Sequence, residues 1–270
     1  MLQSILANNE DICTFPESHL FARTIYKSRL KRKYFLFRKK KLETVNNFLR
    51  VNGYSSLVEE KYKGNPFSLN NWTRFIVSKL DEISLEEIGK ISWMEKTPRH
   101  LHYIDLISKY YPGALFFHII RDPLGNIASL YHLSKLYPGS FKLYSVDAAI
   151  NRYLRDISVS ADYLGKTGNY FLTYQELIEQ TSEVTKKLCD ICELEFDERM
   201  LANTKNVGKI VTENEVWKNK NFDDITRSNK VHERLTVEQV EYVSKRTIAC
   251  DTDKFKLLDS CYLLSTHELQ

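Results

Sequence analysis

Two residues that could hold a phosphate group lie close together in the sequence. Arg121 follows an apolar run, and Ser129 comes eight residues later, after the Asp122-Pro123 pair that is typical of a helix start. The helical part of this spacing spans roughly 9 Å, most of which a guanidinium on its long stem can cover. The pair could therefore bind one phosphate beside the helix N-terminus. The structural alternative is that Arg121 pairs with a carboxylate and that Ser129 lies on a solvated face.

Three further polar residues follow other strand-like runs. They are Glu17 after DICTFP, Lys96 at the end of KISWMEK and Tyr174 at the end of YFLTY. Ligands of open parallel sheets bind beyond the carboxyl ends of the strands, so we expect these residues to gather near Arg121. Each also has an ordinary interpretation: a carboxylate at a helix start, a surface lysine and a tyrosine at the edge of the core.

Alternating helices and strands must position these residues. The continuous apolar run 114–120 predicts a buried central strand of a parallel sheet. Further strands are expected at 11–16, 90–96 and 170–174, and helices at 2–9, 19–52, 72–80, 84–88, 99–110, 123–137, 146–164, 176–193 and 235–248. This order predicts an α/β fold with an open, mainly parallel sheet flanked by helices. No repeat or linker interrupts residues 1–270, which predicts a single domain.

The charge balance excludes some classes of protein and leaves others open. The chain has 39 Lys and Arg against 35 Asp and Glu, a net charge of +4, which is too mild to indicate nucleic-acid binding. Nine basic residues and no acidic one lie between Tyr26 and Lys41. This segment is either a solvated helical face or a surface that attracts an anionic substrate or cosubstrate.

Composition also bears on the compartment. Five cysteines are an odd number in a chain of 270 residues, which argues against a disulfide framework. No apolar stretch reaches the ~18 residues that a membrane span needs. The first residues lack the basic start and long apolar core of a signal peptide. We therefore expect a cytoplasmic protein without a membrane span.

Four segments, in order, resemble sulfotransferases that use 3′-phosphoadenosine 5′-phosphosulfate (PAPS). HIIRDPLGNIASLYH resembles their 3′-phosphate-binding segment, and PESHLF is similar to a segment of the carbohydrate and tyrosylprotein branch. WMEKTPRHLHYIDLI resembles the Lys-Ser/Thr-Pro segment, and YFLTYQELIEQ resembles the segment after the last core strand. The resemblance covers most of residues 1–200. It implies a fold like that of P-loop nucleoside kinases.

The resemblance also implies a direct sulfuryl transfer. An acceptor hydroxyl attacks the sulfur, and adenosine 3′,5′-bisphosphate leaves. By the same resemblance, Glu17 is the general base and Lys96 stabilises the developing charge. His19, two residues after Glu17, is a candidate for contact with the acceptor.

The remaining assignments concern the cosubstrate and the acceptor. Arg121 and Ser129 are expected to hold the 3′-phosphate and Tyr174 to contact the nucleotide, while Thr212 and Lys230 lie where the family often closes a loop over PAPS. The reaction needs no metal. The acceptor is a hydroxyl of a carbohydrate, lipid or peptide, and the basic segment favours an anionic glycan or peptide. The oligomeric state is not indicated.

One part of the family pattern is expected to be missing. The family's 5′-phosphosulfate loop follows a first strand and precedes a helix, and residues 1–9 resemble that helix. Gly165-Lys166-Thr167 is no substitute, because it precedes a strand and has Ser160 where the first glycine of a phosphate loop belongs. Two interpretations remain: a sulfotransferase, or a truncated or degenerate relative that binds nucleotide without transfer. A kinase would need an intact phosphate loop and a magnesium-binding residue.

Overall fold

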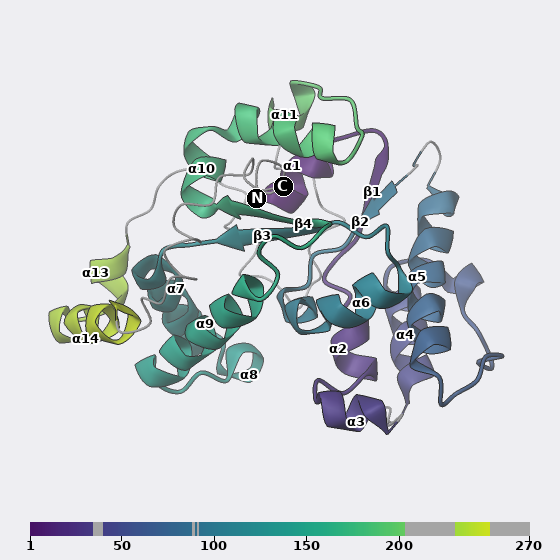
Figure 1. Cartoon of the computed structure of the whole chain (residues 1–270), viewed down its shortest axis with the longest axis horizontal. Helices are drawn as coiled ribbons and strands as arrows, with labels where there is room; N and C mark the ends of the chain where they lie inside the picture. The colour runs from purple at the N-terminus through teal and green to yellow at the C-terminus, as the bar shows by residue number, and fades with distance from the viewer. Residues whose placement is uncertain (35–39, 88–89, 91, 203–229, 249–270) are drawn as a thin grey trace. The chain divides into compact units, whose positions relative to one another are not determined.

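The structure is a computed structural model that describes residues 1–34, 40–87, 90, 92–202 and 230–248. Contacts divide the chain into two compact units. Figure 1 labels the helices and strands from which they are built. The first unit contains residues 1–114 and 185–224, and the second contains residues 115–184 and 225–270. Each unit has its own pair of parallel strands. The expectation of a single domain over 1–270 stays a prediction.

The first unit is built on strands β1 (Ile12–Thr14) and β2 (Ser92–Met94), which pair in parallel with Ile12 opposite Ser92. Its helices are α1 (Leu2–Leu6), α2 (Leu20–Thr24), α3 (Arg29–Lys33), α4 (Lys41–Val51), η1 (Ser55–Leu57), α5 (Leu69–Glu86), η2 (Pro98–Tyr103), α6 (Ile104–Tyr110) and α12 (Arg199–Ala202). Helix α11 (Thr181–Ile191) contains the boundary between the units.

The core of the first unit lies between β1 and helices α2, α4 and α5. Trp72 of α5 is fully buried, and its indole Nε1 donates a hydrogen bond to Thr24 Oγ1 at 3.0 Å. Phe15, directly after β1, meets Phe48 edge to face. Phe15 lies two residues before Glu17 and is buried in this core, so its packing fixes the course of the chain between β1 and Glu17.

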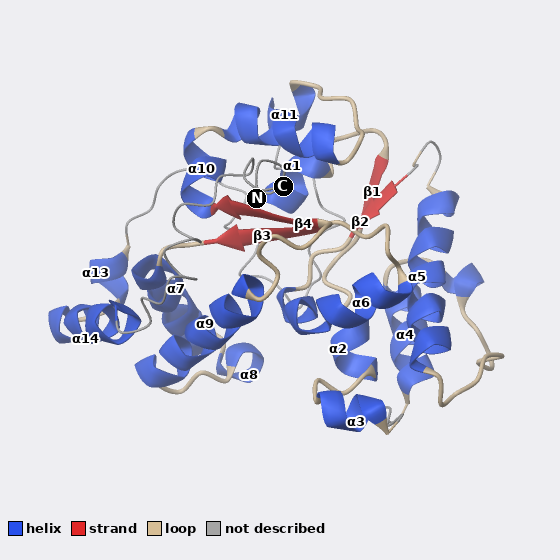
Figure 2. Ribbon diagram, viewed as in Figure 1, coloured by secondary structure: helices blue, strands red, loops and turns tan. Residues whose placement is uncertain are grey.

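The second unit is built on strands β3 (Phe116–Ile120) and β4 (Asn169–Thr173), which pair in parallel with Ile120 opposite Thr173. Its helices, drawn in blue in Figure 2, are α7 (Pro123–Leu136), α8 (Pro138–Phe141), α9 (Val146–Ala161), α10 (Tyr174–Glu179), α13 (Val231–Arg234) and α14 (Val237–Ile248). Helices α9, α13 and α14 pack against α7. Ile119 on β3 is 41% exposed, so among the described residues this strand is less buried than its apolar run predicts.

The predicted fold class is confirmed: parallel strands are flanked by helices. The helix start at Asp122 is also confirmed, since its carboxylate accepts from Gly125 N at 2.5 Å and Pro123 is the first helical residue. Strand β4 ends one residue early, because Thr173 and Glu176 form a capping box that makes Tyr174 the first residue of α10.

The single helix expected over 19–52 is wrong. Its described part forms three helices, because Ile25 is extended, the Ser28 side chain caps α3, and Lys40 takes the left-handed conformation before α4. The helices expected at 72–80 and 84–88 are one, α5. Helix α5 continues through Ser84 to Glu86, the buried hydroxyl of Ser84 donates to the carbonyl of Ser92, and residue 88 lies outside the described residues.

Two other predicted helices also differ. The helix expected over 99–110 begins as a 3-10 helix at Pro98 and becomes α-helical only at Ile104. The helix expected over 176–193 is divided into α10 and α11 on either side of Gln180. The loop expected over 203–228 lies outside the described residues.

Candidate active site

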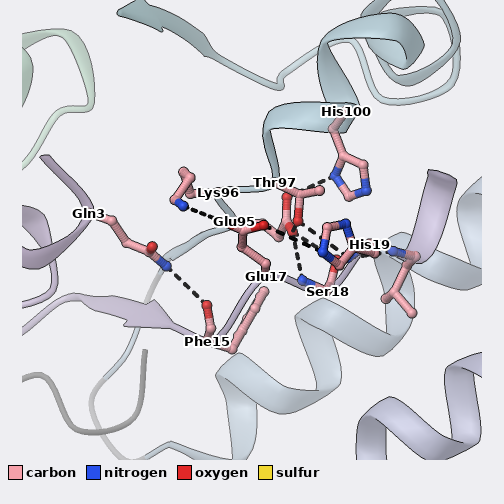
Figure 3. A network of polar contacts seen from close by, with 10 residues as sticks. Gln3, Phe15, Glu17, Ser18, His19, Glu95, Lys96, Thr97 and His100 are labelled. Carbon is pink, nitrogen blue, oxygen red and sulfur yellow. Dashed lines mark hydrogen bonds and ion pairs between the residues drawn. The ribbon is translucent and has the colours of Figure 1, made fainter. Parts of the chain in front are cut away.

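An ion pair between Glu17 and Lys96 lies beyond the carboxyl ends of β1 and β2 (Figure 3). Because β1 and β2 are neighbouring parallel strands, the residues that follow them emerge at the same edge. Lys96 Nζ lies 2.5 Å from Glu17 Oε1. The Glu17 side chain is 12% exposed and that of Lys96 44% exposed, so a nearly buried carboxylate carries a partly exposed cation.

His19 contacts the other carboxylate oxygen of this pair. Its Nε2 lies 3.4 Å from Glu17 Oε2, and its backbone is left-handed with φ 53°. Burial, and then Arg23 and His100, lower the pKa of His19 below 6.5, although Glu17 and Glu95 act in the opposite sense. His19 is therefore mainly neutral at pH 7, with its Nε2 beside the Glu17 carboxylate.

Glu95, which sequence reasoning did not select, occupies the centre of this cluster. Its Oε1 accepts from Ser18 N at 3.1 Å, from Ser18 Oγ at 2.8 Å and from Thr97 Oγ1, and its Oε2 lies 2.8 Å from His100 Nδ1. Burial alone would raise the pKa of Glu95. The charge of His100 and the hydrogen bonds of His100, Thr97 and Ser18 outweigh it and lower that pKa to about 2.

A second cluster forms in the second unit, around Arg121. The guanidinium carbon of Arg121 lies 4.8 Å from the centre of the Tyr174 ring, so the structure brings these two predicted residues together. Arg121 Nε is buried and makes no hydrogen bond among the described residues, and Asp122 Oδ2 is 3.8 Å away. Gly125 keeps this turn compact, because a Cβ there would lie 2.6 Å from Asp122 Oδ2 and 3.2 Å from Arg121 Nε.

Arg234 adds a second guanidinium to this cluster, and sequence reasoning missed it. It ends α13, which packs against α7. Burial and then the like charge of Arg121 lower the pKa of Arg234, so the two side chains are electrostatically close. The predicted Lys230 lies four residues before Arg234, at the start of the same short helix. It was the one sequence signal that pointed to this segment.

Ser129 and Thr212 complete the predicted set. Ser129 lies half-buried on α7, two turns beyond Arg121. Thr212 lies outside the described residues. The predicted residues are therefore divided between the units: in the first, Glu17 contacts Lys96 and His19, and in the second Arg121 contacts Tyr174, while Ser129 and Lys230 lie in the same unit.

The Arg121 cluster suits an anion with several oxygens. Two neighbouring guanidiniums repel each other, and a phosphate would remove that repulsion while accepting from several N–H groups. The buried Nε of Arg121 is a donor that lacks an acceptor of this kind. Within the described ranges, no group of three or more His, Cys, Asp or Glu side chains is placed to hold a metal ion.

Two solved structures share this fold. The chain is similar to the sulfotransferase domain from the curacin biosynthetic pathway, with a TM-score of 0.54, 13% identity and 92% of each chain covered. It is also similar to the sulfotransferase domain from the Synechococcus PCC 7002 olefin synthase, with a TM-score of 0.51, 16% identity, 93% of this chain covered and 90% of that one. The fold is therefore that of sulfotransferase domains.

The sequence gives the same result at the level of the family. The model of the sulfotransferase family matches residues 1–198, and the chain belongs to that family. No curated protein sequence matches it. None of the described helices combines the length and the apolar character that a membrane crossing requires.

Proposed function

We propose that this protein is a sulfotransferase that moves a sulfuryl group from PAPS to a hydroxyl of a carbohydrate, lipid or peptide acceptor. The observation that carries the proposal is the Glu17–Lys96 ion pair beyond β1 and β2. It combines a proton acceptor with a cation, which are the two groups that sulfuryl transfer requires. Membership of the sulfotransferase family supports the reaction class.

In this proposal each residue of the first cluster has one role. Glu17 accepts the proton of the acceptor hydroxyl. The hydroxyl oxygen forms a bond to sulfur as the bond between sulfur and the bridging phosphate oxygen breaks, and adenosine 3′,5′-bisphosphate leaves. Lys96 stabilises the negative charge that develops on the transferred group and the leaving oxygen. His19 holds the Glu17 carboxylate and contacts the acceptor.

The second cluster binds the nucleotide in this proposal. Arg121 and Ser129 hold the 3′-phosphate, and Arg234 joins them as a second charged arm. Tyr174 contacts the nucleotide. Lys230 and Thr212 cover the cosubstrate.

The acceptor in this proposal is an anionic glycan or peptide. Lys27, Lys31 and Lys33 are exposed in and beside α3, in a segment without acidic residues. Their potential would attract a negatively charged acceptor and raise its local concentration. Preference for neutral phenols over anionic acceptors would contradict this part of the proposal.

The test is transfer of labelled sulfuryl from PAPS to a panel of anionic glycans, acidic tyrosine peptides, lipids and neutral phenols. Glu17→Gln keeps the shape of the side chain and removes the base, so we expect about a 100- to 10,000-fold lower rate. Binding of adenosine 3′,5′-bisphosphate should be retained. Glu59→Gln is the matched control, because it weakens a carboxylate contact to the buried Lys79 in the same unit.

The outcomes are distinct. Transfer by the wild type that disappears only in Glu17→Gln supports the proposal. Binding of the nucleotide without transfer to any acceptor would instead favour a degenerate, nucleotide-binding relative. Magnesium-dependent consumption of ATP would favour a kinase.

A further inference from the structure

Glu95 lies between the two segments that carry the proposed catalytic pair. Ser18, which donates to Glu95 twice, directly follows Glu17. Thr97, a third donor, directly follows Lys96, and Lys96 itself follows Glu95. A single buried carboxylate therefore ties the chain beyond β1 to the chain beyond β2, as Figure 3 shows.

We infer that Glu95 is a positioning residue, which sets the distance between Glu17 and Lys96 without touching the substrate. This inference rests on the proposed function, because it assigns Glu95 a part in the same reaction. Misplacing reacting groups by about 1 Å can cost 100-fold in rate, so the site needs such a connection. The strand pairing alone ends at Thr14 and Met94, before either residue is reached.

Burying the Glu95 carboxylate costs free energy, so its presence here is not explained by a gain in stability. A carboxylate is expensive to bury, and an apolar side chain in its place is often at least as stabilising. Here all the donors that satisfy Glu95 come from the two segments and from the turn that follows the second one. The contacts of Glu95 therefore act on the segments that carry Glu17 and Lys96.

The same connection fixes the unusual backbone of His19. Its N–H donates to Thr97 Oγ1 at 3.3 Å, and Thr97 in turn donates to Glu95. A left-handed conformation is unfavourable for a non-glycine residue, so it persists where neighbouring contacts hold it. This conformation occurs at the residue whose ring contacts Glu17.

His100 holds Glu95 through a contact that does not involve Lys96. Its Nδ1 must carry a proton toward Glu95 Oε2, since an ionised carboxylate only accepts. Its ring packs edge to face on Phe21 of α2. Glu95 Oε2 is thus held by a packed imidazole, while Oε1 accepts hydrogen bonds from Ser18 and Thr97.

These contacts predict different results for two substitutions. Glu95→Leu removes every acceptor and leaves Ser18, Thr97 and His100 without one. Glu95→Gln can keep its carbonyl oxygen toward Ser18 and Thr97 and turn its NH₂ toward His100, whose Nδ1 then gives up its proton and accepts instead. We therefore expect Glu95→Leu to lower kcat about 100-fold and Glu95→Gln to keep most of it. Affinity for adenosine 3′,5′-bisphosphate should not change in either variant.

The experiment includes a readout that needs no turnover. Competitive acetylation with acetic anhydride, followed by mass spectrometry, measures the reactivity of Lys96 against Lys90 as internal reference. The ion pair with Glu17 suppresses acetylation of Lys96, so Glu17→Gln marks the upper limit. Glu95→Leu should raise it toward that limit, and Glu95→Gln should stay near wild type. Thr97→Val, a milder change of similar volume, should raise it partly and serves where Glu95→Leu does not fold.

Glu59→Leu is the control, because it also deprives a buried partner, Lys79, of an acceptor but lies outside the cluster. It should lower stability without changing acetylation of Lys96. Wild-type acetylation in a folded Glu95→Leu or Thr97→Val variant would overturn the inference, and so would raised acetylation with unchanged kcat. If the wild type transfers no sulfuryl group, the proposed function fails, while acetylation still decides whether Glu95 holds the pair.

Discussion

At the scale of single residues, the two clusters differ in charge: one pairs a cation with an anion, and the other brings two cations together. Glu17 and Lys96 neutralise each other within one contact. Arg121 and Arg234 repel each other, although Asp122 lies 3.8 Å from Arg121 Nε and Glu233 acts in the opposite sense on Arg234, and a bound anion would relieve that repulsion further. A site that is balanced when empty suits proton transfer, and one that is unbalanced when empty suits binding of a phosphate.

Arg234 gives the sharpest prediction for binding. Arg234→Ala removes one charged donor, so we expect about tenfold weaker binding of adenosine 3′,5′-bisphosphate, measured by calorimetry. Arg155→Ala, at an exposed arginine of the same unit, is the control and should bind like the wild type. Equal affinity of Arg234→Ala and wild type would remove Arg234 from the site.

The positions of some single residues could be predicted from the apolar runs that precede them. Glu17, Lys96, Arg121 and Tyr174 do follow strands, while their roles in the reaction stay predictions. Glu95 could not be predicted, because nothing in the run KISWMEK distinguishes a carboxylate that becomes buried from one that stays on the surface. Its partner Ser18 lies 77 residues away in the chain, so its role exists only after the strands pair.

At the scale of elements, strands and capped helices were the predictable part. β3 and α7 follow from a continuous apolar run and an Asp-Pro start, both of which are local signals. The region 19–52 was misjudged because helical periodicity continues through Ile25, where the backbone is extended. Breaks of this kind are imposed by packing, as Ile25 is fully buried.

The β3–β4 pair contains a buried histidine that predicts a pH dependence. His118 stacks on Phe171 with ring centres 4.4 Å apart, and burial lowers its pKa to about 4, against the hydrogen bond of Asn169. Because the folded pKa lies below the unfolded value of about 6.5, the native state disfavours the charged form. Stability is therefore full above pH ~6.5 and falls as the pH drops toward 4.

The measurement is the free energy of unfolding by urea from pH 7 to pH 4. Wild type should lose up to about 1.4 kcal/mol per pH unit through His118, as an upper bound. His118→Gln, which keeps polar partners for Ser160 and Asn169, should show a flatter dependence. Parallel curves for the two proteins would show that His118 is not the group responsible.

At the scale of the whole molecule, the family was predictable, while the contacts to the cosubstrate stay predictions. Four ordered segments indicated a sulfotransferase, and the family match and the fold agree. Each unit gathers its own cluster from segments up to about 113 residues apart, such as Arg121 and Arg234. The tail residue Thr212 lies outside the described residues, so its assignment still depends on the resemblance alone.

The most direct test of the account is calorimetric binding of adenosine 3′,5′-bisphosphate, with AMP as the control that lacks the 3′-phosphate. We predict binding that requires the 3′-phosphate and is lost in Arg121→Ala. Equal binding of AMP, or unchanged affinity in Arg121→Ala, would contradict the assignment of the Arg121 cluster to the cosubstrate.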